Sequence, residues 1–322
     1  MKKISIAYFG TGEFSASILS DILKDDFFDV KLVVSQADKK VGREQILTQT
    51  PVKKIALENN LEVLQPEKLK ENTEFFDKLK SLYLDFIIVV AYGKIIPKEI
   101  LDIPANFVVN IHGSILPLYR GASPIQESIK SGDTKTGLTI MKMSEGMDEG
   151  DILSIKEVEI NILDKTKDIF DKFSKIGTNL LSETLQKYLN GEIKSIKQDN
   201  SKATYCGKIS KEDGKIDFSN MKAKEIYDLW RAYSIWPGVY TYFNGKKLEI
   251  TDCFFDEQEI SLDDDFSIGD VVELEDHSIK SVGIICFSGI LLINKLKLEG
   301  KKETDIFSFI NGNKDFLDYS FD

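Results

Sequence analysis

A continuous run of apolar residues, Phe86 to Ala91, is the sequence feature that most constrains the fold. A strand with one face in water alternates apolar and polar residues, whereas this run has no polar position. It therefore predicts a strand buried on both faces of a parallel sheet. Further strands are predicted at residues 3–9, 30–35, 107–112 and 137–143, and helices at 13–24 and 51–59. This alternation predicts an α/β fold with a doubly wound, mostly parallel sheet.

The length of 322 residues predicts two domains. We expect the first, catalytic domain to span residues 1–190. It should end with an amphipathic helix at 167–189, whose apolar residues lie three and four apart and which is followed by a C-cap glycine, Gly191. The polar stretch 191–204 is predicted to be a linker.

The second domain, residues 205–322, is predicted to be rich in strands. Asn244-Gly245 indicates a type I′ turn between the two strands of a hairpin at 240–250. Two more strands are predicted at 281–286 and 289–298. The simplest closure of these strands is a small, OB-like β-barrel.

Composition excludes several classes of protein. With 42% hydrophobic and 30% charged residues the chain is typical of a globular protein. No apolar run approaches the roughly 20 residues of a membrane span, and the start of the chain does not fit a secretory signal. Three widely spaced cysteines without a CxxC pair favour neither a disulfide framework nor a zinc site. We expect a cytoplasmic monomer without a metal ion or a membrane partner.

Charge is distributed unevenly. The net charge is −11, and residues 206–322 carry 14 basic against 23 acidic residues, a net of −9. Residues 38–54 have a local surplus of +3. A polyanionic partner would therefore meet a local basic patch. The chain has only three arginines, Arg43, Arg120 and Arg231, and arginine is favoured where a planar fork of donors is needed.

The segment Gly10-Thr11-Gly12 follows the first predicted strand and resembles the start of a dinucleotide-binding fingerprint. Ser15 replaces the third glycine of that fingerprint, and no acidic residue follows at the expected distance of about 20 residues. A tight strand-to-helix turn without a ligand explains the glycines equally well. A nicotinamide-dependent dehydrogenase is therefore a weak alternative.

Asn110 and His112 form the most informative pair of polar residues. Two residues apart on a strand, they point to the same side, at the carboxyl end where such sheets place their chemistry. A rigid loop with two glycines and two prolines follows at 113–124. A lone histidine is usually structural, but this arrangement favours a catalytic role.

The acidic segment Met143 to Leu153 follows the next predicted strand. On its own it is an acidic turn with glycines, which is a common feature. Because the ends of neighbouring strands meet, we expect this segment to lie beside His112.

Together these residues resemble the folate-dependent formyltransferases over nearly the whole chain, and particularly those that act on initiator tRNA. The resemblance is carried by Asn110-x-His112, Asp148 within 147–151, the loop 114–126, the segments 35–38, 42–43 and 50–53, and 230–238. It implies transfer of a formyl group from 10-formyltetrahydrofolate to the α-amino group of methionine on charged initiator tRNA, for translation initiation.

The resemblance also assigns roles to residues. Asn110, a protonated His112 and Asp148 would be catalytic, with Asn110 and His112 donating hydrogen bonds to the oxyanion of a tetrahedral intermediate. Asp148 would keep His112 charged and accept the proton of the amine. Folate would be bound by Ser114, Ile115, Leu116 and Pro117, and the tRNA by Arg43 and by the second domain.

Two departures and several alternatives remain. Gly12 stands where the family usually has proline, and the second domain is acidic although phosphates require positive charge. We expect Lys208, Lys246 and Lys247 to gather on one face. The same three catalytic residues serve sugar-nucleotide and glycinamide-ribotide formyltransferases, and a non-catalytic folate or RNA binder is a third possibility.

Overall fold

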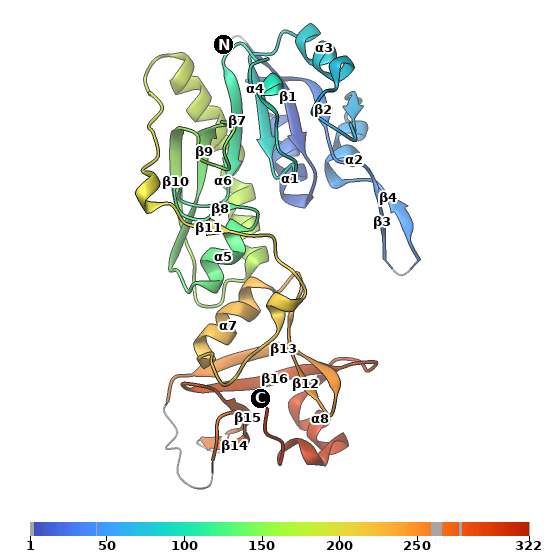
Figure 1. The fold of residues 1–322 in the computed structure, drawn as a ribbon, viewed down its shortest axis with the longest axis vertical. Coiled ribbons are helices and arrows are strands. Elements are labelled where there is room, and N and C mark those ends of the chain that lie inside the picture. The colour runs from blue at the N-terminus through green and yellow to red at the C-terminus, as the bar shows by residue number, and fades with distance from the viewer. Residues whose placement is uncertain (1–2, 43, 259–265, 277–278, 322) are drawn as a thin grey trace. The chain divides into compact units, whose positions relative to one another are not determined.

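The computed structural model describes residues 3–42, 44–258, 266–276 and 279–321 (Figure 1). The chain divides into two compact units. Unit 1 comprises Met1–Pro124, Lys135–Glu159 and Ile169–Gly207, and unit 2 comprises Ile125–Thr134, Ile160–Asp168 and Lys208–Asp322. Residues 191–204 thus belong to unit 1, and a short segment, β11 (Tyr205–Cys206), pairs there with β8 (Arg120–Gly121).

A seven-stranded sheet forms the centre of unit 1. Its strands are β1 (Ile4–Gly10), β2 (Phe28–Val34), β5 (Val63–Leu64), β6 (Phe86–Val90), β7 (Phe107–His112), β9 (Lys135–Lys142) and β10 (Ile152–Glu159). The strand order is β10-β9-β7-β6-β1-β2-β5, in which β7, β6, β1, β2 and β5 are parallel, and β9 and β10 are antiparallel. The predicted α/β class with a mostly parallel sheet is confirmed.

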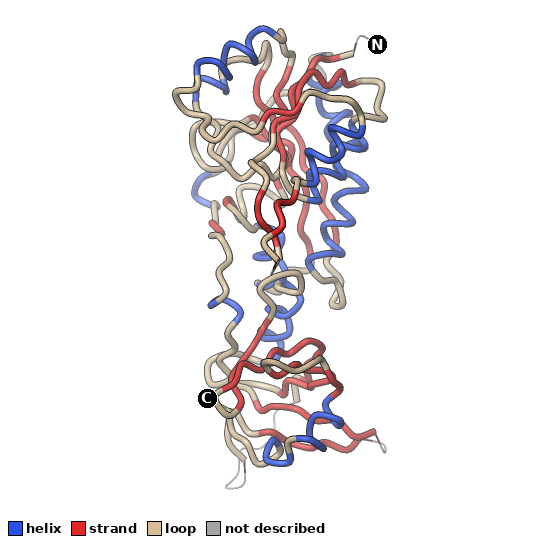
Figure 2. Tube along the Cα trace, turned by 90° about the vertical axis from the view of Figure 1, so that its right-hand side faces the viewer, coloured by secondary structure: helices blue, strands red, loops and turns tan. Residues whose placement is uncertain are grey.

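Helices flank the strands of this sheet (Figure 2). They are α1 (Glu13–Ile22), α2 (Pro51–Glu58), α3 (Thr73–Ser81), α4 (Lys98–Leu101) and α6 (Thr166–Leu189). Phe75 and Leu79 of α3 pack in a buried cluster that includes Val89 of β6 and Val108 of β7. α1 and α6 lie side by side, since Thr178 donates a hydrogen bond to the carbonyl of Ile18.

Several predicted elements are confirmed with small shifts. Helix α6 begins one residue before the predicted 167–189, and Gly191 after it has a positive φ of 74°, which suits a C-cap glycine. In α2, Thr50 caps the helix by accepting a hydrogen bond from the amide of Lys53, as expected from Thr50-Pro51.

The glycine turn after β1 has a packing explanation. A Cβ at Gly10 would lie 1.8 Å from the Ser15 hydroxyl oxygen. Ser15 is fully buried and bonded to the hydroxyl of Tyr8, at 2.6 Å through its carbonyl and at 2.9 Å through its side chain. Gly10 is therefore required for the close approach of α1 to β1, with no ligand needed to explain it.

The route by which Asp148 reaches β7 differs from the expected one. β9 is antiparallel to β7, so Met143 at the end of β9 bonds to the carbonyl of Val108, far from the end of β7. Residues 143–151 are the connection of the β9–β10 hairpin and turn back toward His112. The expected juxtaposition occurs, but the argument from neighbouring parallel strand ends was wrong, because an antiparallel partner was not foreseen.

The segment between β2 and α2 contains a two-stranded hairpin. β3 (Lys39–Val41) pairs with β4 (Ile46–Thr48), antiparallel. Ile46 and Leu47 of β4 are exposed. These short strands bury no apolar face, so the sequence carries no strand pattern here.

Unit 2 contains an antiparallel sheet in the order β12-β13-β16-β15-β14. Its elements are α5 (Pro124–Lys130, which begins in unit 1), α7 (Ala223–Ala232), β12 (Val239–Phe243), β13 (Lys246–Asp256), β14 (Val271–Asp276), β15 (Ile279–Ile285), β16 (Ile290–Leu298), β17 (Thr304–Asp305) and α8 (Ile306–Gly312). Asn244 and Gly245 both have positive φ, as the predicted type I′ turn requires. An antiparallel β domain is confirmed. Among the described residues, β12 and β14 are the edges of this sheet and do not pair to close a barrel.

The core of unit 2 is rich in aromatic residues, and α7 of the same unit carries two buried charged residues, Asp228 and Arg231. Phe243, Phe309 and Phe316 contact one another with ring centroids 5.1–5.9 Å apart. Arg231 of α7 is buried and binds the Asp228 carboxylate on the same helix and the carbonyl of Asp164. The arginine is thus held inside unit 2 by a carboxylate and a backbone carbonyl.

That Lys208, Lys246 and Lys247 gather on one face of the domain stays a prediction. The side chains of Lys246 and Lys247 leave their strand on opposite sides of the sheet, because they are consecutive residues. Both lie on β13, opposite Phe243 and Tyr242 of β12. The ammonium group of Lys247 lies 3.8 Å from the centre of the Tyr240 ring.

The three cysteines are free and buried. Burial raises the pKa of Cys286 to about 12, which makes this thiol unreactive. No helix in the described part of the chain is both long and apolar enough to cross a membrane.

Candidate active site

His112 and Asp148 face each other at the carboxyl end of β7. Nδ1 of His112 lies 3.7 Å from Oδ2 of Asp148, and His112 is 5% exposed. The other ring nitrogen, Nε2, lies 3.1 Å from the carbonyl oxygen of Tyr119. Because a carbonyl can only accept a hydrogen bond, this contact assigns a proton to Nε2. Nδ1 is therefore the ring nitrogen that faces Asp148.

Burial decides the protonation state of His112. Desolvation lowers its pKa below the ordinary 6.5, while the charge of Asp148 and the Tyr119 carbonyl raise it by less. The resting imidazole is thus favoured in its neutral form. This differs from the expectation that Asp148 keeps His112 charged, because the 3.7 Å separation is too long for a charge-assisted hydrogen bond.

Asn110 lies on β7 two residues before His112, so both side chains project from the same face. This face also carries Val108, which belongs to the buried cluster beneath α3. Asn110 is 9% exposed, and its strand is hydrogen-bonded on both sides, to β6 through Val89 and to β9 through Met141. The amide is therefore held on a rigid element at the edge of the buried core.

Asp148 is held in an unusual backbone conformation. Its φ is +51°, in the left-handed region that non-glycine residues rarely adopt. Its Oδ2 accepts a 2.8 Å hydrogen bond from the amide of Gly121. Gly121 itself has φ +125°, and a Cβ there would lie 2.1 Å from the carbonyl oxygen of Cys206. Only glycine can bring this amide so close to Asp148.

The loop expected to bind folate is mostly occupied with its own turn. The hydroxyl of Ser114, fully buried, donates to the carbonyl of Leu118, and the Ser114 carbonyl accepts from Thr139 at 2.6 Å. Leu116 is buried as well, whereas Ile115 and Pro117 are half-buried. The side chains of Ser114 and Leu116 therefore serve the turn, and those of Ile115 and Pro117 retain accessible surface.

Arg43, predicted to contact tRNA, lies outside the described residues. The base of its hairpin lies within the described residues, where an ion pair and the hydrogen bonds of a glutamine side chain hold it in place. Lys53 lies 2.7 Å from a carboxylate oxygen of Asp38, and Gln65 bonds both of these side chains at 2.7 Å. The hydrogen bond from Gln65 and the contact with Lys53 lower the pKa of Asp38. This cluster joins the residue before β3 to the first turn of α2.

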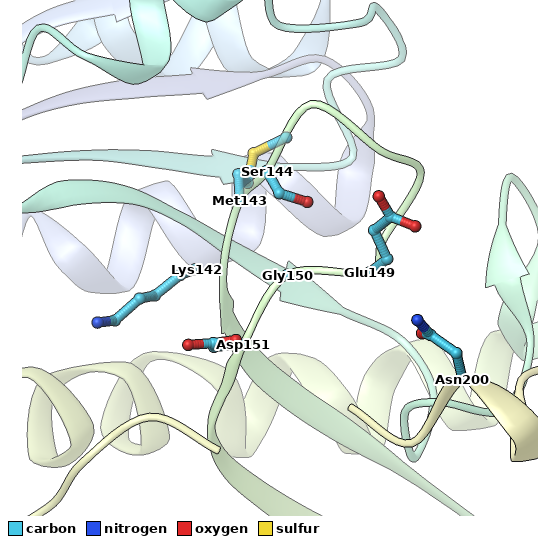
Figure 3. A pocket seen from close by; sticks show the side chains of 7 residues that line it. All are labelled: Lys142, Met143, Ser144, Glu149, Gly150, Asp151 and Asn200. Atoms are coloured by element: carbon cyan, nitrogen blue, oxygen red, sulfur yellow. The ribbon is translucent and has the colours of Figure 1, made fainter. Parts of the chain in front are cut away.

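A pocket of about 430 Å³ lies beside the loop that carries Asp148 (Figure 3). It is lined by Lys142, Met143, Ser144, Glu149, Gly150, Asp151 and Asn200. The Glu149 carboxylate and the Asn200 amide approach it from different segments (Figure 3). Asn110, His112 and Asp148, the predicted catalytic residues, are not among its lining residues, although Asp148 directly precedes Glu149, which lines it.

Two family models match the chain: "Formyl transferase" over residues 2–185 and "Formyl transferase, C-terminal domain" over residues 208–314. The chain belongs to the formyl transferase family. The family expected from the sequence is thereby confirmed, and membership makes the protein an enzyme of formyl transfer. The model that matches the first 185 residues leaves no support for a dehydrogenase.

Relatives of this formyl transferase match over almost their whole length. A methionyl-tRNA formyltransferase of Caldicellulosiruptor saccharolyticus is 44% identical over 97% of this chain and 97% of its own. One of Clostridium novyi is 38% identical over 96% of this chain and 97% of its own.

Solved structures of other formyl transferases share the fold. A sugar 3N-formyl transferase, WlaRD, matches with a TM-score of 0.62 and 22% identity over 94% of this chain and 100% of its own. An N-formyltransferase from Helicobacter canadensis, solved with folinic acid, matches with a TM-score of 0.62 and 21% identity over 94% of this chain and 100% of its own.

Sequence reasoning missed part of this formyl transferase site. Tyr119, Gly121 and Gln198 contact His112 or Asp148 directly, yet none was predicted. Tyr119 and Gly121 act through backbone atoms, which leave no residue-type signal, although the glycine could have been suspected. In the described ranges no group of three or more His, Cys, Asp or Glu residues could hold a metal ion.

Proposed function

We propose that this protein transfers the formyl group of 10-formyltetrahydrofolate to the α-amino group of methionine on charged initiator tRNA. The observation that carries the proposal is the near full-length likeness, at 37–44% identity, to the first three curated relatives, all named methionyl-tRNA formyltransferase. The approach of Asp148 to His112, with Asn110 on the same face of β7 as His112, supports it, because acyl transfer to an amine needs both an oxyanion donor and a proton acceptor.

The reaction proceeds through a tetrahedral intermediate. The amine nitrogen attacks the formyl carbon, a C–N bond forms, and the carbonyl π electrons move to oxygen. The amine then loses a proton, the oxyanion collapses, and the bond to N10 of the folate breaks while N10 takes up a proton. The amine needs little activation, since an α-amino group titrates near pH 8 even when free. The intermediate is therefore the species that the protein must stabilise.

The structure suggests the order in which His112 and Asp148 act. A neutral His112 with its proton on Nε2 offers the Nδ1 lone pair toward Asp148 and the reacting amine. The proton released by the amine is accepted at this pair, directly or through a water molecule. The imidazolium that results is stabilised by the Asp148 carboxylate. Its positive charge stabilises the oxyanion after the attack and not before it.

Asn110 is the donor that is present throughout the reaction. A carboxamide offers two N–H donors, and the rigid position of Asn110 on β7 spares reorganisation when the oxyanion forms. Of the predicted folate-binding residues, Ile115 and Pro117 contribute side-chain contacts, and Ser114 and Leu116 contribute backbone. Arg43 and the hairpin that bears it contact the tRNA.

Further proposals concern the molecule as a whole. We propose that the catalytic domain, predicted as residues 1–190, also includes the stretch 191–204 that was predicted to be a linker, and that residues 205–322 mainly form the tRNA-binding domain. We also propose a monomer that works in the cytoplasm. A sugar-nucleotide N-formyltransferase is the second candidate. A solved sugar 3N-formyl transferase shares the fold at 22% identity, which supports the same class of chemistry but not the same substrate.

One assay separates the candidate substrates. Purified full-length protein is given 10-formyltetrahydrofolate with charged initiator tRNA, with a sugar nucleotide bearing an amino group, or with unacylated tRNA as the control. We expect formyl-methionine to form only with the charged tRNA. Formylation of the sugar nucleotide with a higher kcat/KM would assign the protein to the second candidate.

A further inference from the structure

Arg120 is a buried arginine beside the catalytic cluster. It is 1% exposed, and its Nε and Nη2 donate to one oxygen, Oε1 of Gln198, at 3.0 and 2.7 Å. Nη2 also donates to Oδ1 of Asn200 at 2.7 Å, and Nη1 lies 3.4 Å from the hydroxyl of Tyr205. The acceptors around this guanidinium are neutral, so its contacts orient side chains without neutralising a carboxylate.

Arg120 fixes which way the Gln198 amide points. A guanidinium has only donors, so the amide must turn its oxygen toward Arg120 and its NH2 group away. That NH2 group donates to the carbonyls of Asp148 and Gly150, at 2.8 and 2.7 Å. Only a side chain with an acceptor and two donors can satisfy both sides, which glutamate could not do.

Three consecutive residues, 119–121, thus contact His112 or Asp148, either directly or through Gln198. The Tyr119 carbonyl accepts from His112, Gly121 donates to the Asp148 carboxylate, and Arg120 acts on the Asp148 carbonyl through Gln198. Asp148 is therefore held at its side chain and at its backbone, which keeps its left-handed conformation in place.

Residues that follow helix α6 complete this arrangement. The amide of Arg120 donates to the carbonyl of Thr204 at 2.9 Å, and β8 pairs with β11. Gln198 and Asn200 come from the same stretch, which the sequence predicted to be a mere linker.

We propose that Gln198, oriented by Arg120, is a positioning residue that holds the Asp148 carboxylate opposite Nδ1 of His112. Neither residue touches the substrate in this role. The proposal rests on the formyl-transfer role of Asp148 given above. Without Gln198, the 143–151 loop loses two hydrogen bonds at the point where its backbone is strained, and the carboxylate moves away from the imidazole.

The test is a double-mutant cycle in the full-length protein, measured by steady-state formylation of charged initiator tRNA. Gln198→Ala should lower kcat at least about tenfold, because small misplacements of a catalytic group are costly. KM for tRNA and for 10-formyltetrahydrofolate should stay within about twofold of wild type. The low-pH limb of the kcat profile should move to lower pH, because the charge of Asp148 raises the pKa of His112 and its displacement removes that influence.

In the Asp148→Asn background, Gln198→Ala should lower kcat by less than about a further twofold, because both changes act on one carboxylate. If the kcat of the double variant fell by the product of the two single losses, the proposal would be overturned, since Gln198 would then act elsewhere. Gln198→Glu keeps the size and can pair with Arg120 but offers no donor to the two carbonyls, and it should be as impaired as Gln198→Ala. Wild-type kcat in Gln198→Glu would refute the orientation argument.

Gln186→Ala is the matched control. Gln186 is also half-buried in unit 1, on α6, where its amide donates to the Ser182 hydroxyl at 3.3 Å. Its kcat and pH profile should equal those of wild type, and an equal loss there would show that the assay reports general destabilisation. Full activity of Asp148→Asn would refute the catalytic role of Asp148, whereas an inactive Asp148→Asn with a fully active Gln198→Ala would refute only the positioning role.

Discussion

The protonation of His112 is the residue-scale property on which the chemistry depends. Its ring is nearly inaccessible, one nitrogen is committed to a backbone carbonyl, and the nearest carboxylate is 3.7 Å away. Burial disfavours the imidazolium more than Asp148 favours it. The resting site is thus poised to receive a proton, which matches a reaction whose nucleophile must lose one.

Asn110→Ala removes the side chain that we propose as the oxyanion donor. We expect kcat for formylation to fall by about 10² to 10³, the usual loss for such a donor, with the Kd for 10-formyltetrahydrofolate nearly unchanged. Steady-state kinetics and a folate titration measure the two quantities. A variant that retained a third of wild-type kcat would exclude Asn110 from the transition state.

His112 should also make folding stability depend on pH. The buried ring has a lowered pKa, so the unfolded chain binds a proton near pH 6.5 while the folded chain stays neutral. Stability is therefore lost as the pH falls from about 7 through 6.5 toward the lowered pKa. Urea unfolding of wild type should show a steeper loss than His112→Gln across this window. Parallel curves would mean that His112 is not held neutral by burial.

At the scale of elements, periodicity predicted the long helix α6, the strands of the parallel sheet and the Asn244-Gly245 hairpin, because each is specified by local patterns. The position of Asn110 and His112 at a strand end indicated their role, and the family resemblance added Asp148. The antiparallel β9–β10 hairpin was not predicted, since strand direction depends on which partner a strand finds in space. The network of Gln198 and Gly121 escaped for the same reason: it joins segments 27 to 80 residues apart.

The β3–β4 hairpin carries the second element-scale prediction. Its base is fixed by the Asp38–Lys53 ion pair, which makes it a defined projection of unit 1. Arg43→Ala should raise KM for charged tRNA severalfold and leave KM for 10-formyltetrahydrofolate intact, because an arginine contact to phosphate or base adds about 1–3 kcal/mol. An unchanged KM for the tRNA would remove this hairpin from the binding surface.

For the whole molecule, the distribution of charge limits how tRNA can bind. A net charge of −11 opposes the binding of a polyanion. The local surplus of +3 at residues 38–54 offers a local attraction that the chain as a whole does not. Binding should depend on few phosphate contacts and weaken only moderately with salt.

Salt titration tests this distribution. Substituting both Lys39 and Lys40 with glutamine should reduce the slope of log affinity against log salt by about 2, because each lysine that neutralises a phosphate adds about 1 to that slope. The control substitutes Lys301 and Lys302, two exposed neighbours in unit 2, in the same way. An equal change in the control would place comparable phosphate contacts on unit 2.

The return of residues 198–206 to the catalytic cluster has a practical consequence for dissecting this enzyme. A fragment cut after the last turn of α6 looks complete by sequence, yet it would lack the amide that holds the Asp148 loop and the strand that lies against β8. An excised N-terminal fragment would therefore have to extend at least to Gly207, and the inactivity of a shorter one would say nothing about whether tRNA-binding parts are needed for chemistry.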